Sequence, residues 1–381
     1  MKKEKIGILT MHYKSNYGGI LQSMALYKII QKDNYIVELI DYRPSVVSSL
    51  KLSNIVRKII MFFYKDFFLQ KVNDYFSKLK ISRKRVPQSL YKSFEDFKKA
   101  NDLNYSRQVD DSSISNILNQ YDIVIVGSDQ VWSNLGKNQL IYMLDCDINF
   151  TGKLFAYAAC SSNKVIPFYN RNKVRNLLSK FDGITVRDRN TYELIKKYSQ
   201  KSPMLVADPS LLYDYTDVLD KKKSGIEPYL FVYILGCEIK GGHSNIIEQL
   251  KKKYGLKKVI AVVISDISLE AEKIADEVIY DASPSVWLNL LYNASFVYTD
   301  SFHGCMFSMK YKKMFIGYYV SLSRASRLID LKERFSLSNI ISSADNFCID
   351  NINIDYSRIT PLLEEQVKYS LTCLKGYLSF K

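Results

Sequence analysis

The sequence lacks any apolar run long enough to cross a membrane. After Met1-Lys2-Lys3-Glu4-Lys5 only a few apolar residues follow before polar ones return, which is too short for a signal-peptide core. No other uncharged segment approaches the roughly 20 residues that a spanning helix requires. We therefore expect a cytoplasmic protein, and one that associates with a membrane, if at all, only peripherally at the inner face.

Paired metal ligands and disulfide frameworks are also missing. The six cysteines, at positions 146, 160, 237, 305, 348 and 373, are widely separated, with no Cys-x-x-Cys and no metal-ligand spacing to any of the three histidines. This pattern is typical of reduced thiols in the cytoplasm and speaks against a zinc site. We expect neither a metal nor a cofactor.

No nucleotide-binding fingerprint follows the first predicted strand. The apolar run Ile6 to Thr10 is followed by Asn16-Tyr17-Gly18-Gly19 and a helical pattern from Ile20 to Ile30, which predicts a strand, a glycine loop and a helix. The loop is neither Gly-x-Gly-x-x-Gly nor a Walker sequence. Its glycines serve either a tight turn or contact with a ligand, and the sequence leaves both open.

What the chain does have is length, apolar content and positive charge. It contains 381 residues, of which 47% are hydrophobic, and 54 basic residues against 39 acidic ones give a net charge of +15. A chain of this length predicts two domains. The charge favours anionic partners such as phosphorylated small molecules or an acidic membrane surface. No recognisable RNA- or DNA-binding motif accompanies it, so we expect no nucleic-acid partner.

From about residue 46 to 115 the alternation of strands and helices stops. Between Val46 and Arg85 ten basic residues stand against two acidic ones, interleaved with phenylalanines and tyrosines, which predicts basic aromatic helices. Two interpretations remain open. The segment rests on an anionic leaflet, or its aromatic rings pack on the domain and its lysines form a solvated face.

The alternation on both sides of this insertion predicts an α/β fold with two doubly wound, Rossmann-like domains, the layout of the glycosyltransferase-B architecture. We place the domains at residues 1–222, with the helical insertion at about 46–115, and at 223–355. Residues 356–381 form a C-terminal helix that we expect to pack back toward the first domain.

Polar residues follow several predicted strands directly. They are Gly127-Ser128-Asp129-Gln130 after Tyr121–Val126, Arg187-Asp188 after Gly183–Val186, and Asp208-Pro209-Ser210 after Pro203–Ala207. Ligands bind at the carboxyl ends of strands in open α/β sheets. A buried arginine there is costly unless it meets an anion. That anion is either a protein carboxylate, such as Asp188, or a phosphate or carboxylate of a ligand.

The predicted strand Ser295 to Thr299 ends in Asp300-Ser301-Phe302-His303-Gly304, where a helix begins. A helix N-terminus next to a strand end suits an anion, because backbone N–H groups converge there. Asp300, Ser301 and His303 are therefore candidates for chemistry. In the alternative interpretation Asp300 or Ser301 caps the helix and His303 is an interior, hydrogen-bonded histidine.

Taken in order, six motifs resemble those of the polysaccharide pyruvyl transferase family. They are Asn16-Tyr17-Gly18-Gly19, Gly127-Ser128-Asp129-Gln130-Val131-Trp132, Val186-Arg187-Asp188, Asp208-Pro209-Ser210-Leu211-Leu212, Thr299-Asp300-Ser301-Phe302-His303-Gly304 and Ser326-Arg327. The resemblance implies a glycosyltransferase-B-like fold with an N-terminal acceptor domain and a C-terminal donor domain. It also implies transfer of the enolpyruvyl group of phosphoenolpyruvate onto a sugar, usually as a cyclic ketal.

The resemblance implies roles for individual residues. It maps donor binding onto Arg187 and catalysis onto His303, an imidazole suited to protonate the methylene carbon. We add Asp300 as its orienter or alternate proton carrier and Asp129 as the general base. Several family members carry arginine where this chain has Ser301, so other cations must help to hold the phosphate. The candidates are Lys310, Lys312, Lys313, Arg324 and Arg327, and further substrate contacts are expected from Asn16, Tyr17, Gly18, Gly19, Ser128, Gln130, Ser301 and Gly304.

The family context favours an undecaprenyl-diphosphate-linked saccharide as acceptor, as in capsule or exopolysaccharide assembly. Two rival functions remain: a nucleotide-sugar-dependent glycosyltransferase of the same fold, and a non-catalytic peripheral membrane or polyanion-binding protein. A Ser/His hydrolase built on Ser301 and His303 is disfavoured, because no Gly-x-Ser-x-Gly elbow precedes them.

Overall fold

The computed structural model describes residues 3–12, 15–45, 87–146, 148–220, 226–235, 242–264, 270–319, 322–344, 349–350 and 352–379. Most of the basic aromatic insertion, residues 46–86, lies outside the described residues, so both interpretations of it stay predictions. The chain divides into two compact units. Unit 1 lies within Met1–Lys71, Asp102–Tyr213 and Glu364–Lys381, and unit 2 within Val72–Asn101 and Asp214–Leu363.

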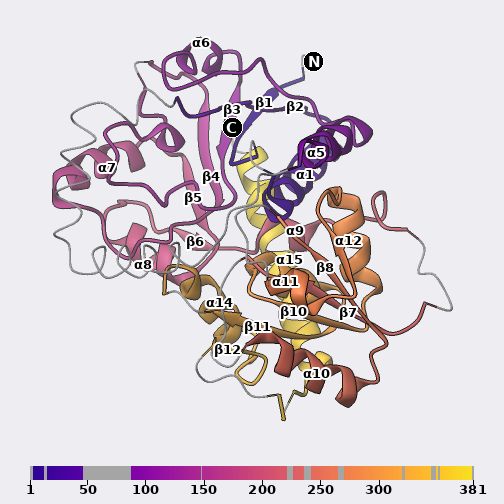
Figure 1. The fold of residues 1–381 in the computed structure, drawn as a ribbon. Coiled ribbons are helices and arrows are strands. Elements are labelled where there is room, and N and C mark those ends of the chain that lie inside the picture. The colour runs from indigo at the N-terminus through magenta and orange to yellow at the C-terminus, as the bar shows by residue number, and fades with distance from the viewer. Residues whose placement is uncertain are drawn as a thin grey trace. The chain divides into compact units, whose positions relative to one another are not determined.

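Unit 1 is built on a six-stranded parallel sheet with the order β2-β1-β3-β4-β5-β6 (Figure 1). Its strands are β1 (Lys5–Leu9), β2 (Ile36–Leu39), β3 (Ile123–Val126), β4 (Lys153–Ala159), β5 (Gly183–Val186) and β6 (Met204–Leu205). Its helices are α1 (Tyr17–Lys32), α6 (Ser115–Leu118), α7 (Arg171–Leu178), α8 (Arg189–Lys196) and α9 (Pro209–Leu212), with the short 3₁₀ turns η1 (Ile141–Met143) and η2 (Phe168–Asn170).

Strand β4 shows why this sheet is covered on both faces. Leu154 and Ala156 belong to a core cluster that also contains residues of α6, α7 and α8. The alternate residue Phe155 stacks on Tyr377 with ring centroids 4.4 Å apart. Tyr377 belongs to the long C-terminal helix α15 (Tyr356–Leu378), whose Ser370 also accepts a hydrogen bond from Ala207 N at 2.8 Å. Successive side chains of a strand point to opposite faces, so an unbroken apolar run fits a sheet between two helical layers.

Unit 2 holds a second parallel sheet of six strands in the order β12-β11-β10-β7-β8-β9. The strands are β7 (Tyr229–Tyr233), β8 (Lys258–Val262), β9 (Glu277–Ile279), β10 (Phe296–Thr299), β11 (Met314–Tyr319) and β12 (Ile341–Ser343). The helices are α5 (Gln88–Ala100), α10 (His243–Tyr254), α11 (Glu270–Ile274), α12 (Pro284–Asn293), α13 (Phe302–Lys310) and α14 (Leu322–Arg334), joined by the first turns of α15.

Each sheet has one position where the strand order reverses direction. In unit 1 this switch point lies between β1 and β3, and in unit 2 between β10 and β7. Neighbouring crossovers leave a switch point on opposite faces of the sheet, which opens a crevice at the carboxyl ends of these strands. The polar motifs after β3 and β10 therefore sit where open α/β sheets place ligands. The two doubly wound sheets confirm the predicted fold class.

The first helix differs from the prediction. Gly18 and Gly19 belong to its first turn and not to a preceding loop, because α1 begins at Tyr17 and Asn16 caps it, accepting a hydrogen bond from Gly19 N at 3.2 Å. A β-carbon on Gly19 would stand 3.1 Å from Met11 O. The glycine thus permits close packing of α1 on the segment after β1.

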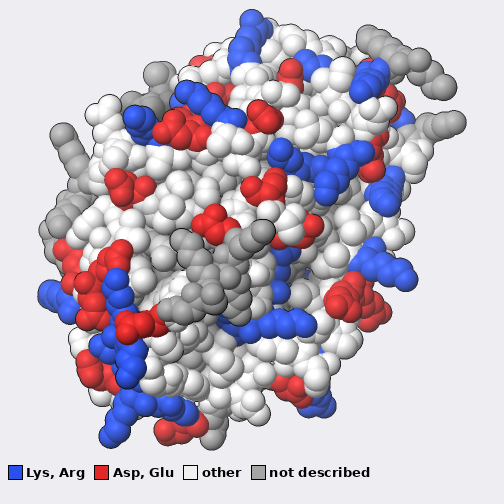
Figure 2. Space-filling model, turned by 90° about the vertical axis from the view of Figure 1, so that its right-hand side faces the viewer, with Lys and Arg blue, Asp and Glu red and all other residues white. Residues whose placement is uncertain are grey.

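Among the described residues, no helix is both long and apolar enough to cross a membrane. On the face drawn in Figure 2, basic and acidic side chains intermingle, and neither sign covers a continuous area. On the described part of that face, the positive charge is thus not gathered into one patch (Figure 2).

Candidate active site

In unit 2 two hydrogen bonds join the carboxyl ends of the two strands that flank the switch point and the residues that follow them. Thr299 Oγ1, at the end of β10, donates to Tyr233 O of β7 at 2.5 Å. The next residue, Asp300, is 3% exposed and accepts a hydrogen bond from Leu235 N through Oδ1. Asp300 therefore fixes the chain that leaves β7.

His303 lies in the first turn of α13, immediately beyond this junction. Ser301 caps the helix and accepts from Gly304 N at 3.3 Å, as the capping interpretation expected. His303 is 6% exposed and its ring stands edge-on to that of Phe302, with centroids 5.3 Å apart. A histidine in the first turn of a helix lies beside backbone N–H groups that favour anions.

Gly304 has a packing role that the sequence did not disclose. A β-carbon at this position would stand 2.5 Å from Thr299 Oγ1. The absence of a side chain therefore lets α13 begin directly against the end of β10. Behind it, burial and the nearby Asp300 carboxylate raise the pKa of the Cys305 thiol well above its ordinary value, so this thiol stays protonated.

The structure separates the cations proposed to compensate for Ser301. The Arg327 guanidinium lies over the Phe302 ring, 5.6 Å from its centroid. Phe302 directly precedes His303 in the sequence. Lys310 and Lys313 lie at the other end of α13, roughly 10 Å along the axis at 1.5 Å per residue, where they contact the rings of Tyr215 and Tyr292. Lys312 lies just beyond the same end of α13 and is exposed. Arg324 is in α14, but its side chain lies outside the described ones.

In unit 1 the ends of β3, β5 and β6 meet in a buried charged cluster. Arg187, 2% exposed, donates from Nη1 to Asp208 Oδ2 at 2.5 Å and from Nη2 to Asp129 Oδ1 at 3.2 Å. Burial alone lowers the pKa of this guanidinium, but the Cys160 sulfur and the two aspartates beside it raise the pKa well above its ordinary value. The arginine carries one positive charge against two carboxylates.

Arg187 thus meets protein carboxylates, one of the two alternatives left open, but Asp188 is not among the ion-pair partners found for it. Asp188 caps α8 instead, accepting from Thr191 N at 2.8 Å, and also accepts from Cys160 Sγ at 2.8 Å. Successive residues in extended backbone point to opposite sides, which is why the neighbouring carboxylate serves the helix.

The turn that carries Asp129 is held on several sides. Ser128 Oγ donates to Asp208 Oδ2 at 3.3 Å, and Thr10 Oγ1 donates to Ser128 O at 3.0 Å. Gly127 has φ 118° and a β-carbon there would lie 2.2 Å from Tyr157 O. Asp129 itself has φ 70°, a strained conformation that surrounding contacts must maintain. Its side chain is 9% exposed.

Two partners in this cluster were missed as site residues, Asp208 and Thr10. Asp208 follows a predicted strand just as Asp129 does, and that position was the signal available in the sequence. The Asn16 to Gly19 motif serves the start of α1, while Gln130 lines a pocket beside β3. Within the described residues, no group of three or more His, Cys, Asp or Glu side chains is arranged to hold a metal ion.

The fold and these two polar strand edges define a class, an α/β protein with glycosyltransferase-B-like architecture. The family model for polysaccharide pyruvyl transferases matches residues 16–321. The chain therefore belongs to the polysaccharide pyruvyl transferase family, which confirms the resemblance inferred from the six motifs. No curated protein matches the chain significantly in sequence.

Solved structures share the fold at low sequence identity. A candidate UDP-N-acetylglucosamine 2-epimerase of Listeria monocytogenes matches with a TM-score of 0.52 and 10% identity, over 99% of this chain and 89% of its own. The Anabaena protein Alr3699/HepE, solved with UDP and glucose, matches with a TM-score of 0.50 and 10% identity, over 99% of both chains. At this identity the likeness establishes the fold alone.

Proposed function

We propose that this protein transfers the pyruvyl group of phosphoenolpyruvate to a sugar and forms a pyruvate ketal. Family membership supports pyruvyl transfer. The observation that carries the proposal is His303 in the first turn of α13, beside the hydrogen-bonded junction of β10 and β7. This arrangement offers an anion-binding helix start and a proton donor at one strand edge.

The reaction sets the requirements that these groups meet. His303 delivers a proton to the methylene carbon of phosphoenolpyruvate, and a sugar hydroxyl bonds to the adjacent carbon and loses its own proton. A second hydroxyl of the sugar then bonds to the same carbon, the C–O bond to the phosphate breaks, and inorganic phosphate leaves with the proton of that hydroxyl. The product carries the methyl group made by the first protonation and two new C–O bonds. The N–H groups at the start of α13 and the guanidinium of Arg327 hold the donor's anionic groups.

On the acceptor side we assign Asp129 as the base that takes the hydroxyl proton. Arg187 was expected to clamp the donor. With its guanidinium buried between Asp129 and Asp208, it is better suited to position the Asp129 carboxylate than to bind a ligand directly. Asp300, whose Oδ1 accepts from Leu235 N, similarly positions the junction that carries His303.

We further propose a hexose of a lipid-linked repeat unit as the acceptor, in capsule or exopolysaccharide assembly. The strongly basic chain suits a diphosphate-bearing substrate near an anionic membrane surface. A peripheral position at that surface would depend on the basic aromatic segment before residue 87.

The test incubates the full chain with phosphoenolpyruvate and a panel of lipid-linked or nitrophenyl hexosides and analyses the products by mass spectrometry. Pyruvyl ketal formation with release of phosphate supports the proposal. In parallel, phosphoenolpyruvate should raise the melting temperature, while UDP- and GDP-sugars should not. Stabilisation by a nucleotide sugar, with hexosyl transfer and no pyruvylation, would instead identify a glycosyltransferase.

A further inference from the structure

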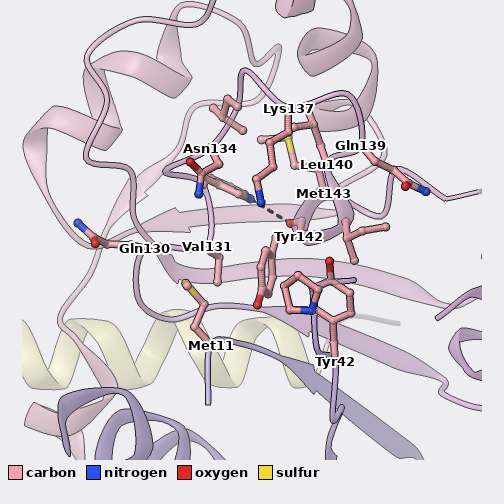
Figure 3. A pocket seen from close by; sticks show the side chains of 14 residues that line it. Met11, Tyr42, Gln130, Val131, Asn134, Lys137, Gln139, Leu140, Tyr142 and Met143 are labelled. Atoms are coloured by element: carbon pink, nitrogen blue, oxygen red, sulfur yellow. Dashed lines mark hydrogen bonds between the residues drawn. The ribbon is translucent and has the colours of Figure 1, made fainter. Parts of the chain in front are cut away.

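Unit 1 contains a pocket of about 230 Å³ at the switch point of its sheet. Its walls come from the segments that follow β1, β2 and β3 and from the loop that leads into η1 (Figure 3). The lining residues that carry the argument below are Tyr42, Gln130, Trp132, Lys137, Gln139 and Tyr142. We call this the Tyr42–Tyr142 pocket.

Aromatic rings form the inner wall of the pocket. The Tyr42 and Tyr142 rings meet edge-on with centroids 5.4 Å apart, and Trp132 Nε1 donates to Tyr142 O at 3.1 Å. These contacts hold the flat apolar faces of the Tyr42 and Tyr142 rings in place beside their polar hydroxyl groups. Such surfaces suit a ligand with both C–H faces and hydroxyl edges.

Several polar side chains also line the pocket. Figure 3 shows Lys137 extending from the loop toward the Tyr42 and Tyr142 rings, with Gln130 and Gln139 at opposite ends of the view. Lysine donates only, whereas an amide both donates and accepts. Among the described residues that line the pocket none is acidic, so the lining favours neutral or acidic ligands over cationic ones.

The loop that carries Lys137 is fixed from behind. Asn170, 1% exposed, donates through Nδ2 to Leu135 O and Lys137 O, each at 2.7 Å. Tyr169 OH donates to Gly136 O at 3.1 Å, and Lys173 Nζ donates to Asn138 O at 2.7 Å. A loop held at four consecutive carbonyl groups presents a preformed surface, which reduces the ordering cost of binding.

The pocket adjoins the turn that carries the proposed base. Gln130 and Val131, which line it, follow Asp129 directly, and Val131 N donates to Asp129 O at 2.8 Å. We propose that the Tyr42–Tyr142 pocket binds a single neutral or acidic hexose ring of the acceptor and presents its hydroxyls toward Asp129. The volume lies below the roughly 300–1,000 Å³ of sites for drug-sized ligands, which fits one sugar ring. This inference rests on the proposed pyruvyl transfer.

The test compares Lys137→Ala/Gln139→Ala with the matched control Lys180→Ala, an exposed lysine at the end of α7 that does not line the pocket. Using a nitrophenyl hexoside that the wild type pyruvylates, we expect the double variant to raise the acceptor KM at least tenfold. The KM for phosphoenolpyruvate and the melting temperature should stay unchanged, and Lys180→Ala should match the wild type. An unchanged acceptor KM in the double variant overturns the pocket assignment, although pyruvyl transfer stands.

Direct binding separates failure of the pocket from failure of the reaction. Titration calorimetry with the methyl hexosides of glucose, galactose, mannose and glucuronic acid, without phosphoenolpyruvate, should show binding that the double variant weakens at least tenfold. If the wild type binds in this way but pyruvylates no member of the acceptor panel, the pocket stands and the proposed function fails. Absence of hexoside binding by the wild type overturns the pocket.

Discussion

Arg187 Nη1 and Asp208 Oδ2 lie 2.5 Å apart, with side chains that are 2% and 1% exposed. The two residues follow different strands, β5 and β6, and the same arginine reaches Asp129 after β3. One guanidinium therefore ties together three strand ends at the carboxyl edge of unit 1. This links the stability of unit 1 to the placement of the proposed base.

Removing one partner of this buried pair should be strongly destabilising. We expect Asp208→Ala to lower the free energy of unfolding by about 3–5 kcal/mol, because it removes the buried carboxylate that accepts hydrogen bonds from Arg187 Nη1, Ser128 Oγ and Ser210 N. Urea unfolding measures the effect. The control is Glu277→Ala, which breaks the Lys258–Glu277 pair whose side chains are both 44% exposed. It should cost no more than about 1 kcal/mol. Equal losses in the two variants would contradict the role of burial.

Gly127 should tolerate no side chain. With φ 118° and a would-be β-carbon 2.2 Å from Tyr157 O, Gly127→Ala should destabilise the protein by more than about 1 kcal/mol and reduce kcat by moving Asp129. Gly376→Ala, in α15 with nothing within 4 Å of the added carbon, should be neutral or stabilising by up to about 1 kcal/mol. Thermal unfolding of both variants measures the change in stability, and a kinetic assay of Gly127→Ala measures the change in kcat. A Gly127→Ala protein with wild-type stability would refute the account of this turn.

Asp110 should titrate well below an ordinary aspartate. Hydrogen bonds from the side chains and backbone N–H groups of Ser112 and Ser113 lower its pKa to about 2. Since the folded pKa is depressed, these bonds stabilise the folded state above the ordinary value near 3.8 and lose this contribution as the pH falls toward about 2. A carboxyl-detected NMR titration should show the low value, and Ser112→Ala/Ser113→Ala should raise the pKa toward the ordinary one, because only the backbone N–H donors remain. An ordinary pKa in the wild type would contradict the geometry.

His303→Gln should separate chemistry from binding. Glutamine keeps polar atoms near the start of α13 but cannot act as a general acid, so kcat should fall by roughly 10²–10⁴. Stabilisation of the protein by phosphoenolpyruvate should persist, because the helix start and Arg327 remain. Both are measured on one preparation, by phosphate release and by melting temperature. Retained turnover would remove His303 from the mechanism.

The sequence was sufficient to predict the two sheets and most strand ends. Buried strands such as β3 and β10 are short apolar runs bounded by polar residues, and this pattern can be recognised in the sequence without any tertiary information. The sequence predicted the start of α1 three residues too late, because two adjacent glycines are typical of a loop. Only the packing of α1 on Met11 O shows why glycine stands inside the helix.

The partners within the site could not be predicted in the same way. Asp188 is adjacent to Arg187 in sequence, yet the arginine pairs with Asp129 and Asp208, 58 and 21 residues away. Pairing across a parallel sheet depends on strand order, which sequence adjacency does not encode. The cations proposed near His303 illustrate the same limit, since Lys310 is the last residue of its helix and Lys313 lies just beyond that end.

Pyruvyl transfer in D₂O tests the central proposal most directly. The methylene carbon of phosphoenolpyruvate must gain one proton from solvent-exchangeable groups to become the methyl group of the ketal. Mass spectrometry of the product should therefore show one non-exchangeable deuterium in each pyruvyl group, with phosphate released in equal amount, and His303→Gln should yield almost none of this product. An acceptor that gains no pyruvyl group, or a pyruvyl adduct without deuterium, would contradict the account.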